Sequence, residues 1–332
     1  MQPKAHLHSV GSSAPRLTEF DRQLIAALQT NGRTPYSTLA SMLGASEAAV
    51  QRRTQQLIDL GLFKIVGAVD PLRVGHGHAV MVALRCEPRS MSDVEDAVAA
   101  IPQVRFLSIV SGTYDIVCEV VAADRDEATD ILLHCLTAIP GIRAVNTSWV
   151  LKTYKTNFRW DALGTQTNGP SVAIGESLLG GNQSLSLDEL DERIVELLQQ
   201  NGRASYAEIA ERLGTTVSTA RRRTLRLLQS GYVTVIALGN PLRLGFEDVV
   251  LLWLKVELAR TEEIIARLKE EPAVRYLSRV AGEADILAEL LFPHDASLVE
   301  FLDGPLARVK GIREVALSFE LSIRKRGYTV FE

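Results

Sequence analysis

The chain repeats itself at a constant offset of 170 residues, and this repeat constrains its fold more than any other feature. Residues 17–75 align with residues 187–245 without a gap, and 21 of these 59 pairs are identical. Average composition would give roughly three or four identities. The repeat units of solenoid proteins are far shorter, at about 20–50 residues. The sequence therefore predicts two fused copies of one module, whose function depends on what the two copies do together.

Composition describes a globular protein without a general affinity for nucleic acid. The 332 residues are 46 % hydrophobic and 23 % charged, with a net charge of −4, so any nucleic-acid binding must come from local positive patches. No stretch resembles a signal peptide or a membrane span, which predicts a cytoplasmic protein. Residues 1–16 are expected to form a flexible tail. Residues 159–186, rich in Gly, Asn, Ser, Thr and Gln, are expected to form a linker between the copies.

Cysteine and histidine do not form a metal-binding pattern. Cys86, Cys118 and Cys135 all lie in the first copy and have no metal-like spacing, so buried reduced thiols are favoured over a redox or metal role. The run His76-Gly77-His78 would supply only half a metal site, and turn histidines without a metal are favoured there. We therefore expect no metal and no cofactor.

The first part of each copy, residues 17–75 and 187–245, has the pattern of a helix-turn-helix domain. Thr18 or Asp188 can cap a first helix, which the run Asn-Gly-Arg is expected to stop with a left-handed residue. A short second helix ends at a glycine, and a third helix runs from about Ser46 to Leu60 or from Thr216 to Ser230. Short β-branched runs at 63–69 and 233–238 follow and resemble a wing. In this arrangement the third helix enters the major groove of DNA.

The third helix of each copy carries the residues expected to meet DNA. Val50 and Leu57 face the core, so Arg52 points away from it. Arginine and glutamine can read base edges, and arginine also neutralises phosphates. A solvated helix face is the simpler alternative, but the doubled arginines at the same helical position in both copies favour DNA. The expected contact residues are Ser46, Ala48, Ala49, Gln51, Arg52 and Arg53, with Thr216, Ser218, Thr219, Arg221, Arg222, Arg223 and Arg226.

The two predicted reading helices are not equivalent. The second copy has arginine at 221 and 226, where the first has Gln51 and Gln56, and the first copy adds Glu47 near the expected phosphates. We therefore expect the second copy to contribute more affinity for DNA. Replacing Arg222 and Arg223 by alanine should then weaken binding more than replacing Arg52 and Arg53.

The second part of each copy, residues 76–158 and 246–332, is predicted to form a ferredoxin-like domain. Its elements follow the order strand, helix, strand, strand, helix, strand, which gives a four-stranded antiparallel sheet with helices on one face. The fold class is thus α+β. The expected strands are 79–86, 104–110, 116–122 and 144–151, and 249–258, 274–280, 286–292 and 314–323, with helices at 92–100 and 126–138. Tyr154-Lys155 and Arg324-Lys325-Arg326 are expected to lie past the last strands as solvated or phosphate-steering residues.

The combination of these motifs resembles the leucine-responsive/asparagine regulator (Lrp/AsnC) family of transcription regulators. The resemblance is carried by Asn-Gly-Arg, the Leu-Gly before the third helix, the Arg-Arg pair and the Gly-x-x-Asp turn, in both copies. It implies sheet-to-sheet pairing of the second domains and binding of a small effector, commonly an amino acid. One chain would supply the pair that the family normally obtains from a dimer, and larger homo-oligomers are plausible by analogy.

The resemblance places the effector near the turn between the two central strands. A glycine there lets backbone N–H groups approach a carboxylate, and an aspartate can accept from an ammonium. Gly and Asp are also ordinary hairpin-turn residues, and both readings stay open. The candidate effector residues are Gly112, Thr113, Tyr114 and Asp115, with Gly282, Glu283, Ala284 and Asp285.

An enzyme on the same scaffold is the alternative. Tetrapyrrole (sirohaem) decarboxylases resemble this family and can also be fused as two copies, and the resemblance implies histidines on the central strands. Residues 104–108 and 274–278 contain no histidine. The favoured prediction is therefore a DNA-binding regulator and not an enzyme. Its two unlike reading helices predict an operator with two unlike half-sites.

Overall fold

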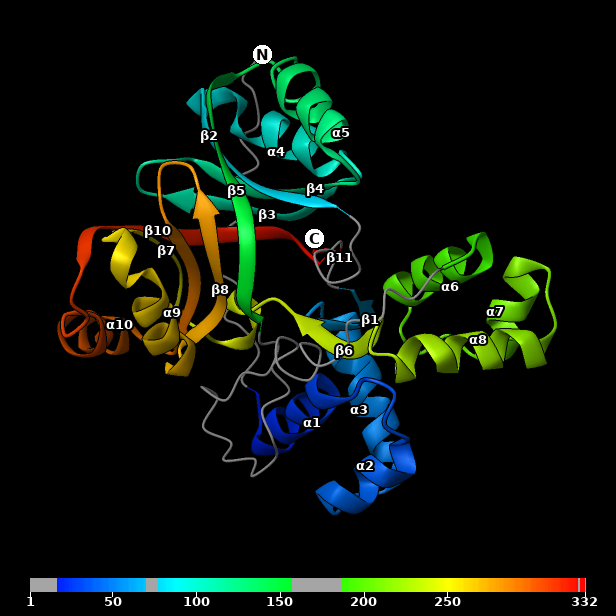
Figure 1. Ribbon diagram of the computed structural model, residues 1–332. Helices are drawn as coiled ribbons and strands as arrows, with labels where there is room; N and C mark the ends of the chain where they lie inside the picture. Colours follow the sequence, from blue (N-terminus) through cyan, green and yellow to red (C-terminus); the bar gives the residue numbers. More distant parts are fainter. Residues whose placement is uncertain (1–16, 70–76, 157–186, 328, 332) are drawn as a thin grey trace, which may run out of the picture.

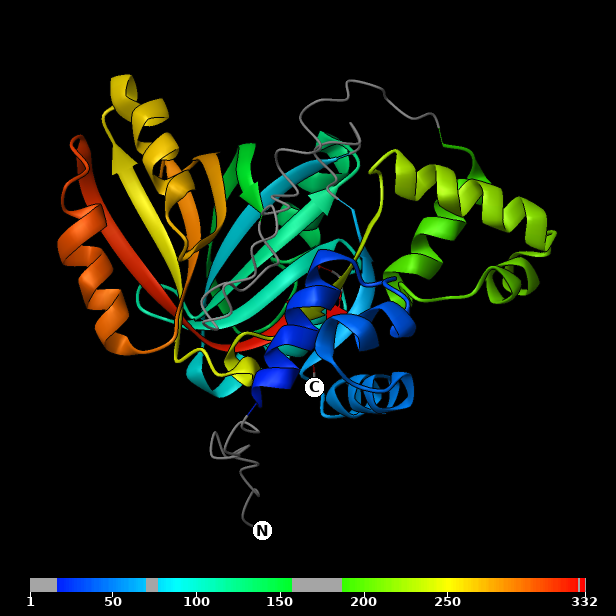
Figure 2. The same cartoon turned by 90° about the horizontal axis from the view of Figure 1, so that it is seen from below.

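The computed structural model describes residues 17–69, 77–156, 187–327 and 329–331. The expected tail and linker, and His76, lie outside these residues. Each copy contributes three helices, one short strand and a four-stranded sheet with helices on one face, in the predicted order (Figure 1). In the pictures the two three-helix groups, α1–α3 in blue and α6–α8 in green, extend from the sheets as separate arms (Figures 1 and 2).

The three helices of each arm begin and end where the sequence predicts. Gly44 and Gly214 end the second helix in a left-handed conformation, with φ of 63°. The hydroxyl of Ser46 caps the third helix by accepting from the Ala49 N–H at 3.2 Å, and Thr216 does the same in the second copy. The helices are α1 (Glu19–Thr30), α2 (Tyr36–Leu43) and α3 (Glu47–Asp59), then α6 (Glu189–Gln200), α7 (Tyr206–Leu213) and α8 (Val217–Gln229).

A two-stranded ribbon joins the two arms. Strand β1 (Phe63–Ala68) pairs antiparallel with β6 (Thr234–Gly239), and Val66 lies opposite Ile236, which is its own counterpart at offset 170. The register is therefore symmetric about this pair. The predicted wings do not act separately, because each supplies one half of a ribbon shared by the two copies.

The Asn-Gly-Arg run joins the copies and does not act as a left-handed helix stop. Asn31 and Asn201 are extended, with φ of −152° and −142°. The N–H of Gly32 donates to the Val235 carbonyl at 2.7 Å, and the N–H of Gly202 donates to the Ile65 carbonyl at 2.8 Å. The expectation was wrong because the partner of each run lies in the other copy, about 170 residues away.

The arginines of the two runs complete this junction. The Arg33 guanidinium donates to the carbonyls of Gly202 and Ala204 at 3.1 and 3.0 Å, and Arg203 donates to the Thr34 carbonyl at 2.7 Å. Arg33 and Arg203 also lie over the rings of Tyr206 and Tyr36 of the opposite copy. The two arms therefore hold each other by reciprocal contacts.

The two four-stranded sheets join edge to edge into one closed barrel. Around the ring the strands run β3-β4-β2-β5-β8-β9-β7-β10, and β10 pairs with β3 to close it. The two joints are equivalent: Trp149 pairs with Ala281, and its counterpart Phe319 pairs with Ser111. The strands are β2 (His78–Cys86), β3 (Val104–Ser111), β4 (Ile116–Ala122), β5 (Ile142–Thr156), β7 (Asp248–Val256), β8 (Val274–Ala281), β9 (Ile286–Phe292) and β10 (Ile312–Arg326), with β11 (Thr329–Val330) added beside β10.

Alternate residues of each strand serve two different cores. In β2 the side chains of Val80, Val82 and Leu84 pack under the helices of their own copy, while those of Ala79, Met81 and Ala83 point into the barrel. The helices α4 (Met91–Ala99), α5 (Arg125–Asp130), α9 (Thr261–Glu270) and α10 (Asp295–Phe301) lie on two outer faces (Figure 1). Both faces of β4 and β9 are thus buried, while β5 and β10 keep exposed residues on the outside of the barrel. One chain forms the pair of sheets by itself.

The last strand of each sheet is longer than predicted. Lys155 and Lys325 were expected past the strands in solvent, but they are buried, near the ends of β5 and β10. The Lys155 ammonium donates to the carbonyls of Lys269 and Glu271 at 2.8 Å, at the end of α9, and Lys325 donates to the Ile101 carbonyl at 3.2 Å. A cation is favourable at a helix C-terminus. Each lysine therefore ties one copy to a helix end of the other.

Two further expectations need correction in the first ferredoxin-like unit. The predicted helix at 126–138 is interrupted, because α5 ends at Asp130 and a π-helical turn covers Ile131–Cys135. Cys135 is exposed, whereas Cys86 and Cys118 are buried as expected. Burial raises the pKa of Cys86 to about 11 and that of Cys118 to about 12, so both thiols stay protonated near neutral pH.

Ion pairs to buried aspartates hold the third helix of each arm against the first. The Arg53 Nε atom lies 2.6 Å from Oδ1 of Asp21, a fully buried residue that also closes the capping box of α1 with Thr18. In the second copy Arg223 lies 3.1 Å from Asp191 Oδ1 and 2.6 Å from Asp188 Oδ2, and Arg226 also pairs with Asp191. These arginines therefore stabilise the arms.

Substituting Gly202 by alanine should destabilise the junction of the arms. A Cβ atom there would lie 2.6 Å from Val235 Cγ1 and 2.9 Å from the Val66 carbonyl carbon, so the ribbon would have to shift. Overpacking of this kind costs about 1–3 kcal/mol. We expect a lower midpoint of thermal unfolding by circular dichroism. Gly304→Ala is the matched control because no atom lies within 4 Å of its Cβ position. Equal midpoints for the two variants would contradict the assignment.

Substituting Arg53 by alanine should lower the free energy of unfolding by about 1–3 kcal/mol at pH 7, because it leaves a buried carboxylate without its partner. Burial raises the pKa of Asp21, but hydrogen bonds from Arg53 and Thr18 outweigh this and hold it below 3.8. A depressed carboxyl pKa stabilises the fold above the unfolded-state pKa and loses this effect as the pH falls through the folded-state pKa. The deficit of the variant should therefore shrink below about pH 4 in urea denaturation series.

Arg52→Ala provides the control for this series. Arg52 is exposed and makes no ion pair with any residue that the structure describes. Surface substitutions of this kind usually change the free energy of unfolding by less than about 0.5 kcal/mol. A loss as large as that of Arg53→Ala, or a deficit that does not change with pH, would remove the assigned role of the Asp21–Arg53 pair.

Candidate nucleic-acid interface and ligand cavities

The N-terminal halves of α3 and α8 present most of the predicted contact residues to solvent. Ala49 and Thr219 are half-buried behind the capping residues of their helices. Arg52 in the first copy, and Arg221 and Arg222 in the second, are exposed and form no ion pair within the described part of the chain. The exposed residues are Ser46, Ala48, Gln51 and Arg52, and Thr216, Ser218, Arg221, Arg222 and Arg226.

The structure corrects the expected orientation of three of these arginines. Arg53, Arg223 and Arg226 were expected to point outward, but each reaches back to an aspartate at the start of the first helix of its arm. Arg53 and Arg223 are half-buried as a result. The spacing could have shown this for Arg53, because it lies three residues after buried Val50 and therefore on the edge of the core face.

The exposed surfaces of α3 and α8, which we call the reading surfaces, differ in charge. In α8 the exposed arginines at 221 and 222 stand where α3 has Gln51 and Arg52. Exposed Glu47 at the start of α3 is replaced by exposed Val217 in α8. The second surface is therefore more positive and lacks the acidic residue that would repel a phosphate.

Each Gly-x-x-Asp turn combines a hydrogen bond within its own copy with a close approach to the other copy. The Asp115 carboxylate accepts from the Cys86 N–H at 2.8 Å, and the Asp285 carboxylate accepts from the Val256 N–H at 2.8 Å. A Cβ atom at Gly282 would lie 2.7 Å from the Thr147 carbonyl oxygen of the other copy, and one at Gly112 would lie 2.9 Å from that of Leu317. Glycine and aspartate thus have structural roles here, and the predicted contact of the aspartate with a ligand ammonium competes with its backbone bond.

The other four turn residues meet at one cavity, which we call the turn cavity. Its volume is about 280 Å3, and both turns contribute to its wall. Tyr114 donates a hydrogen bond to the carboxylate of Glu283, and its ring centroid lies 6.4 Å from that of Trp253. The lining residues are Met81, Ala83, Thr113, Tyr114, Asn146 and Ser148, and Trp253, Leu254, Lys255, Glu283, Ala284, Glu314, Ala316 and Ser318.

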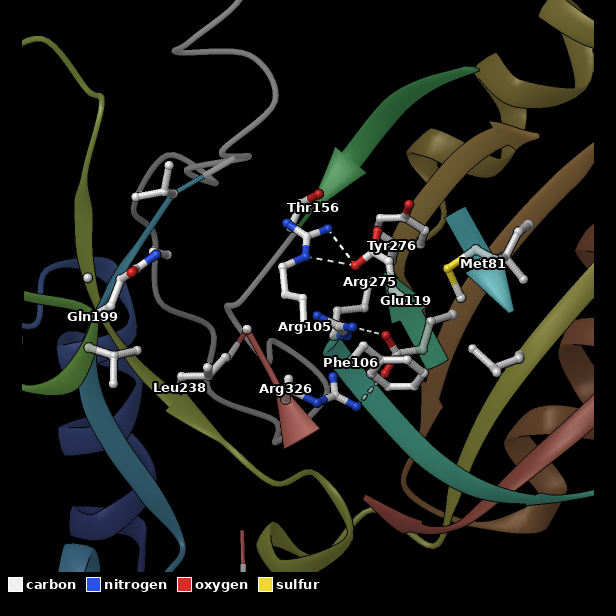
Figure 3. Close-up of a pocket in the computed structure, with 18 residues that line it drawn as sticks. Met81, Arg105, Phe106, Glu119, Thr156, Gln199, Leu238, Arg275, Tyr276 and Arg326 are labelled. Carbon is white, nitrogen blue, oxygen red and sulfur yellow. Dashed lines mark hydrogen bonds and ion pairs between the residues drawn. The ribbon is translucent and has the colours of Figure 1, made fainter. Parts of the chain in front are cut away.

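A second cavity, which we call the ribbon cavity, lies where the β1–β6 ribbon meets the barrel (Figure 3). Its volume is about 90 Å3, and residues of the ribbon such as Val66 and Leu238 line it together with barrel residues. Figure 3 shows Arg105, Arg275 and Arg326 converging on it from the barrel side.

A buried ion network forms the wall of the ribbon cavity. Arg105 lies 2.6 Å from Glu119 Oε2, Arg275 pairs with Glu289, and Arg326 Nη2 lies 2.6 Å from Glu289 Oε1. Burial lowers the pKa of Arg326 and raises that of Glu320, which lies beside it. This network was not predicted from the sequence, although charged Arg105 and Arg275 lie within apolar strands and match at offset 170.

The described residues hold no group of three or more histidine, cysteine, aspartate or glutamate side chains placed to bind a metal ion. His78 packs edge-on against Trp149, with ring centroids 5.8 Å apart. Within the same residues, no helix has the length and apolar character that a membrane crossing requires.

Comparison with known proteins assigns the two halves of each copy. The family model of the AsnC-type helix-turn-helix domain matches residues 17–58 and 187–228. That of the Lrp/AsnC ligand binding domain matches residues 79–160 and 249–330. An uncharacterised helix-turn-helix-type transcriptional regulator of Pyrococcus abyssi is 34 % identical over 148 residues, which are 44 % of this chain and 94 % of the relative. The transcriptional regulator Ptr1 of Methanocaldococcus jannaschii is 35 % identical over 131 residues, 38 % of this chain and 88 % of that protein.

A solved structure matches nearly the whole chain. The crystal structure of the siroheme decarboxylase NirDL covers 95 % of this chain and 94 % of its own, with a TM-score of 0.62 and 15 % identity. This likeness extends to both copies and concerns the fold alone. The relatives similar in sequence each match about one copy. Two helix-turn-helix domains and two ligand-binding domains of one kind, in alternation along a single polypeptide, make this chain a tandem-duplicated member of the Lrp/AsnC family of transcription regulators.

Proposed function

We propose that the chain recognises an operator composed of two unlike half-sites and that a small effector bound in the ferredoxin-like barrel controls this recognition. The observation that carries the proposal is the pair of unequal arginine surfaces on α3 and α8, attached to one symmetric ribbon. A pair of identical subunits presents two equal readers, whereas a fused pair presents two different ones. Selection of bound sequences from random duplex DNA tests this directly. An operator with two equal half-sites would contradict it.

The proposed effector is a small molecule, an amino acid or a related metabolite, bound beside the two Gly-x-x-Asp turns. Support comes from Thr113, Tyr114, Glu283 and Ala284, which line the turn cavity. The effector would act through a difference in its affinity for two arrangements of the arms on the barrel. The ribbon cavity lies between the arms and the barrel, because residues of the ribbon and of the barrel both line it.

We further expect chains to associate with one another and to act in the cytoplasm. Leu151 on β5 and its counterpart Leu321 on β10 are exposed at 57 % and 56 %. Each leucine is an exposed apolar contact point on its own strand, and we expect chains to pair through these two points. Light scattering of the purified protein measures the resulting mass.

Substituting Arg222 by alanine should weaken DNA binding more than substituting Arg52. Removing one arginine that contacts a base or phosphate costs about 1–3 kcal/mol of binding free energy. We expect about a tenfold loss for Arg222→Ala. The loss for Arg52→Ala should be smaller, because α3 carries fewer exposed arginines than α8. In addition, exposed Glu47 on α3 repels the phosphates. Fluorescence anisotropy with labelled operator at several salt concentrations measures both losses.

Arg267→Ala is the control for this comparison, since Arg267 is an exposed arginine on α9, outside the arms. Its affinity should equal that of the unchanged protein. Arg53 and Arg223 are unsuitable for the comparison because each holds its arm together. Equal losses for Arg52→Ala and Arg222→Ala would show that the two readers contribute equally.

The alternative function is an enzyme acting on a tetrapyrrole, which the fold of NirDL brings to attention. Histidine is absent from the barrel strands β3, β4, β8 and β9, which the structure describes in full. We therefore expect no histidine axial ligand for a tetrapyrrole iron from these strands. Titration of the purified protein with an iron tetrapyrrole should leave the absorbance spectrum that of the free pigment. A stoichiometric complex with a shifted absorbance band would favour the enzyme.

A further inference from the structure

The turn cavity lies on the approximate twofold axis that relates the two copies. Five pairs of its lining residues are counterparts at offset 170, among them Ala83 with Trp253 and Thr113 with Glu283. In a symmetric dimer a cavity on this axis would have two identical halves. Here only one of the five pairs, Ser148 and Ser318, keeps the same residue. The fusion has therefore allowed a single cavity with two different sides.

The differences between the sides are complementary in size. Trp253 of the second copy stands opposite Ala83 of the first, and Tyr114 of the first stands opposite Ala284 of the second. The rings of Tyr114 and Trp253 are tilted by 59° and approach each other across the junction of the copies. Two aromatic walls remain beside an open volume of about 280 Å3, close to the lower end of the range for small-molecule pockets.

The charged residues of the turn cavity all come from the second copy. Glu283 and Glu314 stand where the first copy has Thr113 and Ala144. Glu314 is neutralised by Lys255, whose ammonium lies 2.8 Å from Glu314 Oε2. Glu283 makes no salt bridge with the described residues, and its carboxylate accepts the hydroxyl of Tyr114. One carboxylate beside two aromatic faces favours a positively charged ligand.

We propose that the turn cavity binds one organic ammonium ion per chain, with the ammonium on Glu283 and an apolar body between Tyr114 and Trp253. This inference deepens the proposed function, on which it rests, by giving the effector site a charge preference and a stoichiometry. A second ligand related by the twofold axis would need a second carboxylate and a second pair of rings. The counterparts of Glu283, Tyr114 and Trp253 are Thr113, Ala284 and Ala83, which supply none of these. The repeat therefore gives one site and not two.

The fluorescence of Trp253 reports binding directly in the full-length protein. Phenethylamine and isoamylamine serve as ammonium probes, and 3-phenylpropionate serves as a matched probe with a carboxylate in place of the amine. We expect both amines to change the emission, with half-saturation at a concentration at least tenfold below that for 3-phenylpropionate. Equilibrium dialysis should give one bound amine per chain. Two per chain, or no binding by either amine, would overturn the inference.

Glu283→Gln keeps the size of the side chain and removes its charge, and it should raise the half-saturating amine concentration about tenfold. Glu257→Gln is the control, because Glu257 is exposed and lies outside the cavity. Trp253→Phe should abolish the fluorescence change while dialysis still detects one bound amine. An unchanged affinity in Glu283→Gln would also overturn the inference.

Binding of labelled operator is measured in parallel without any amine. If the chain binds DNA but neither amine, the inference fails and the proposed DNA recognition stands. If it binds an amine but no DNA sequence selectively, the proposed function fails while the cavity keeps its ligand.

Discussion

The backbone hydrogen bonds that join β5 to β8 and β10 to β3 are the interaction on which the rest of the structure depends. An isolated four-stranded sheet would expose two edges and one apolar face. Joining the two sheets at equivalent positions removes both pairs of edges and encloses the side chains of Met81, Val117 and Leu287 in a common interior. Each copy is therefore incomplete without the other. The ribbon and the reciprocal bonds of Arg33 and Arg203 extend the same dependence to the arms.

The framework of the pair is symmetric, whereas the surfaces that can contact other molecules are not. Some positions at the joints keep their residue types, such as Lys155 and Lys325 at the ends of α9 and α4. Positions on the reading helices and in the turn cavity have diverged, as in Arg221 against Gln51 and Trp253 against Ala83. This division is what the physical constraints predict. A lysine that bonds to a helix end of the other copy must keep its reach and charge, while a residue that faces a ligand can change with that ligand.

Local periodicity was enough to predict the helices of the arms and the order of the barrel strands. It failed where the determining partner lies far away in the sequence. The Asn-Gly-Arg runs were misread because Gly32 donates to Val235, and β5 was predicted too short because its last residues pair with β8 of the other copy. Arg53 differs from these cases, because its contact with Asp21 follows from a local feature, its position at the edge of the core face. The turn residues were identified by resemblance, but only the structure shows that Tyr114 and Glu283 meet.

Closure of the barrel within one polypeptide has a consequence for how such a protein responds to its own abundance. The pairing of an ordinary dimer depends on the concentration of its subunits, so dilution dissociates it into parts that cannot bind together. In this chain the two halves are linked, and their association is an intramolecular event. The paired reading helices persist at any copy number. A cell could therefore keep this molecule scarce without losing the paired form.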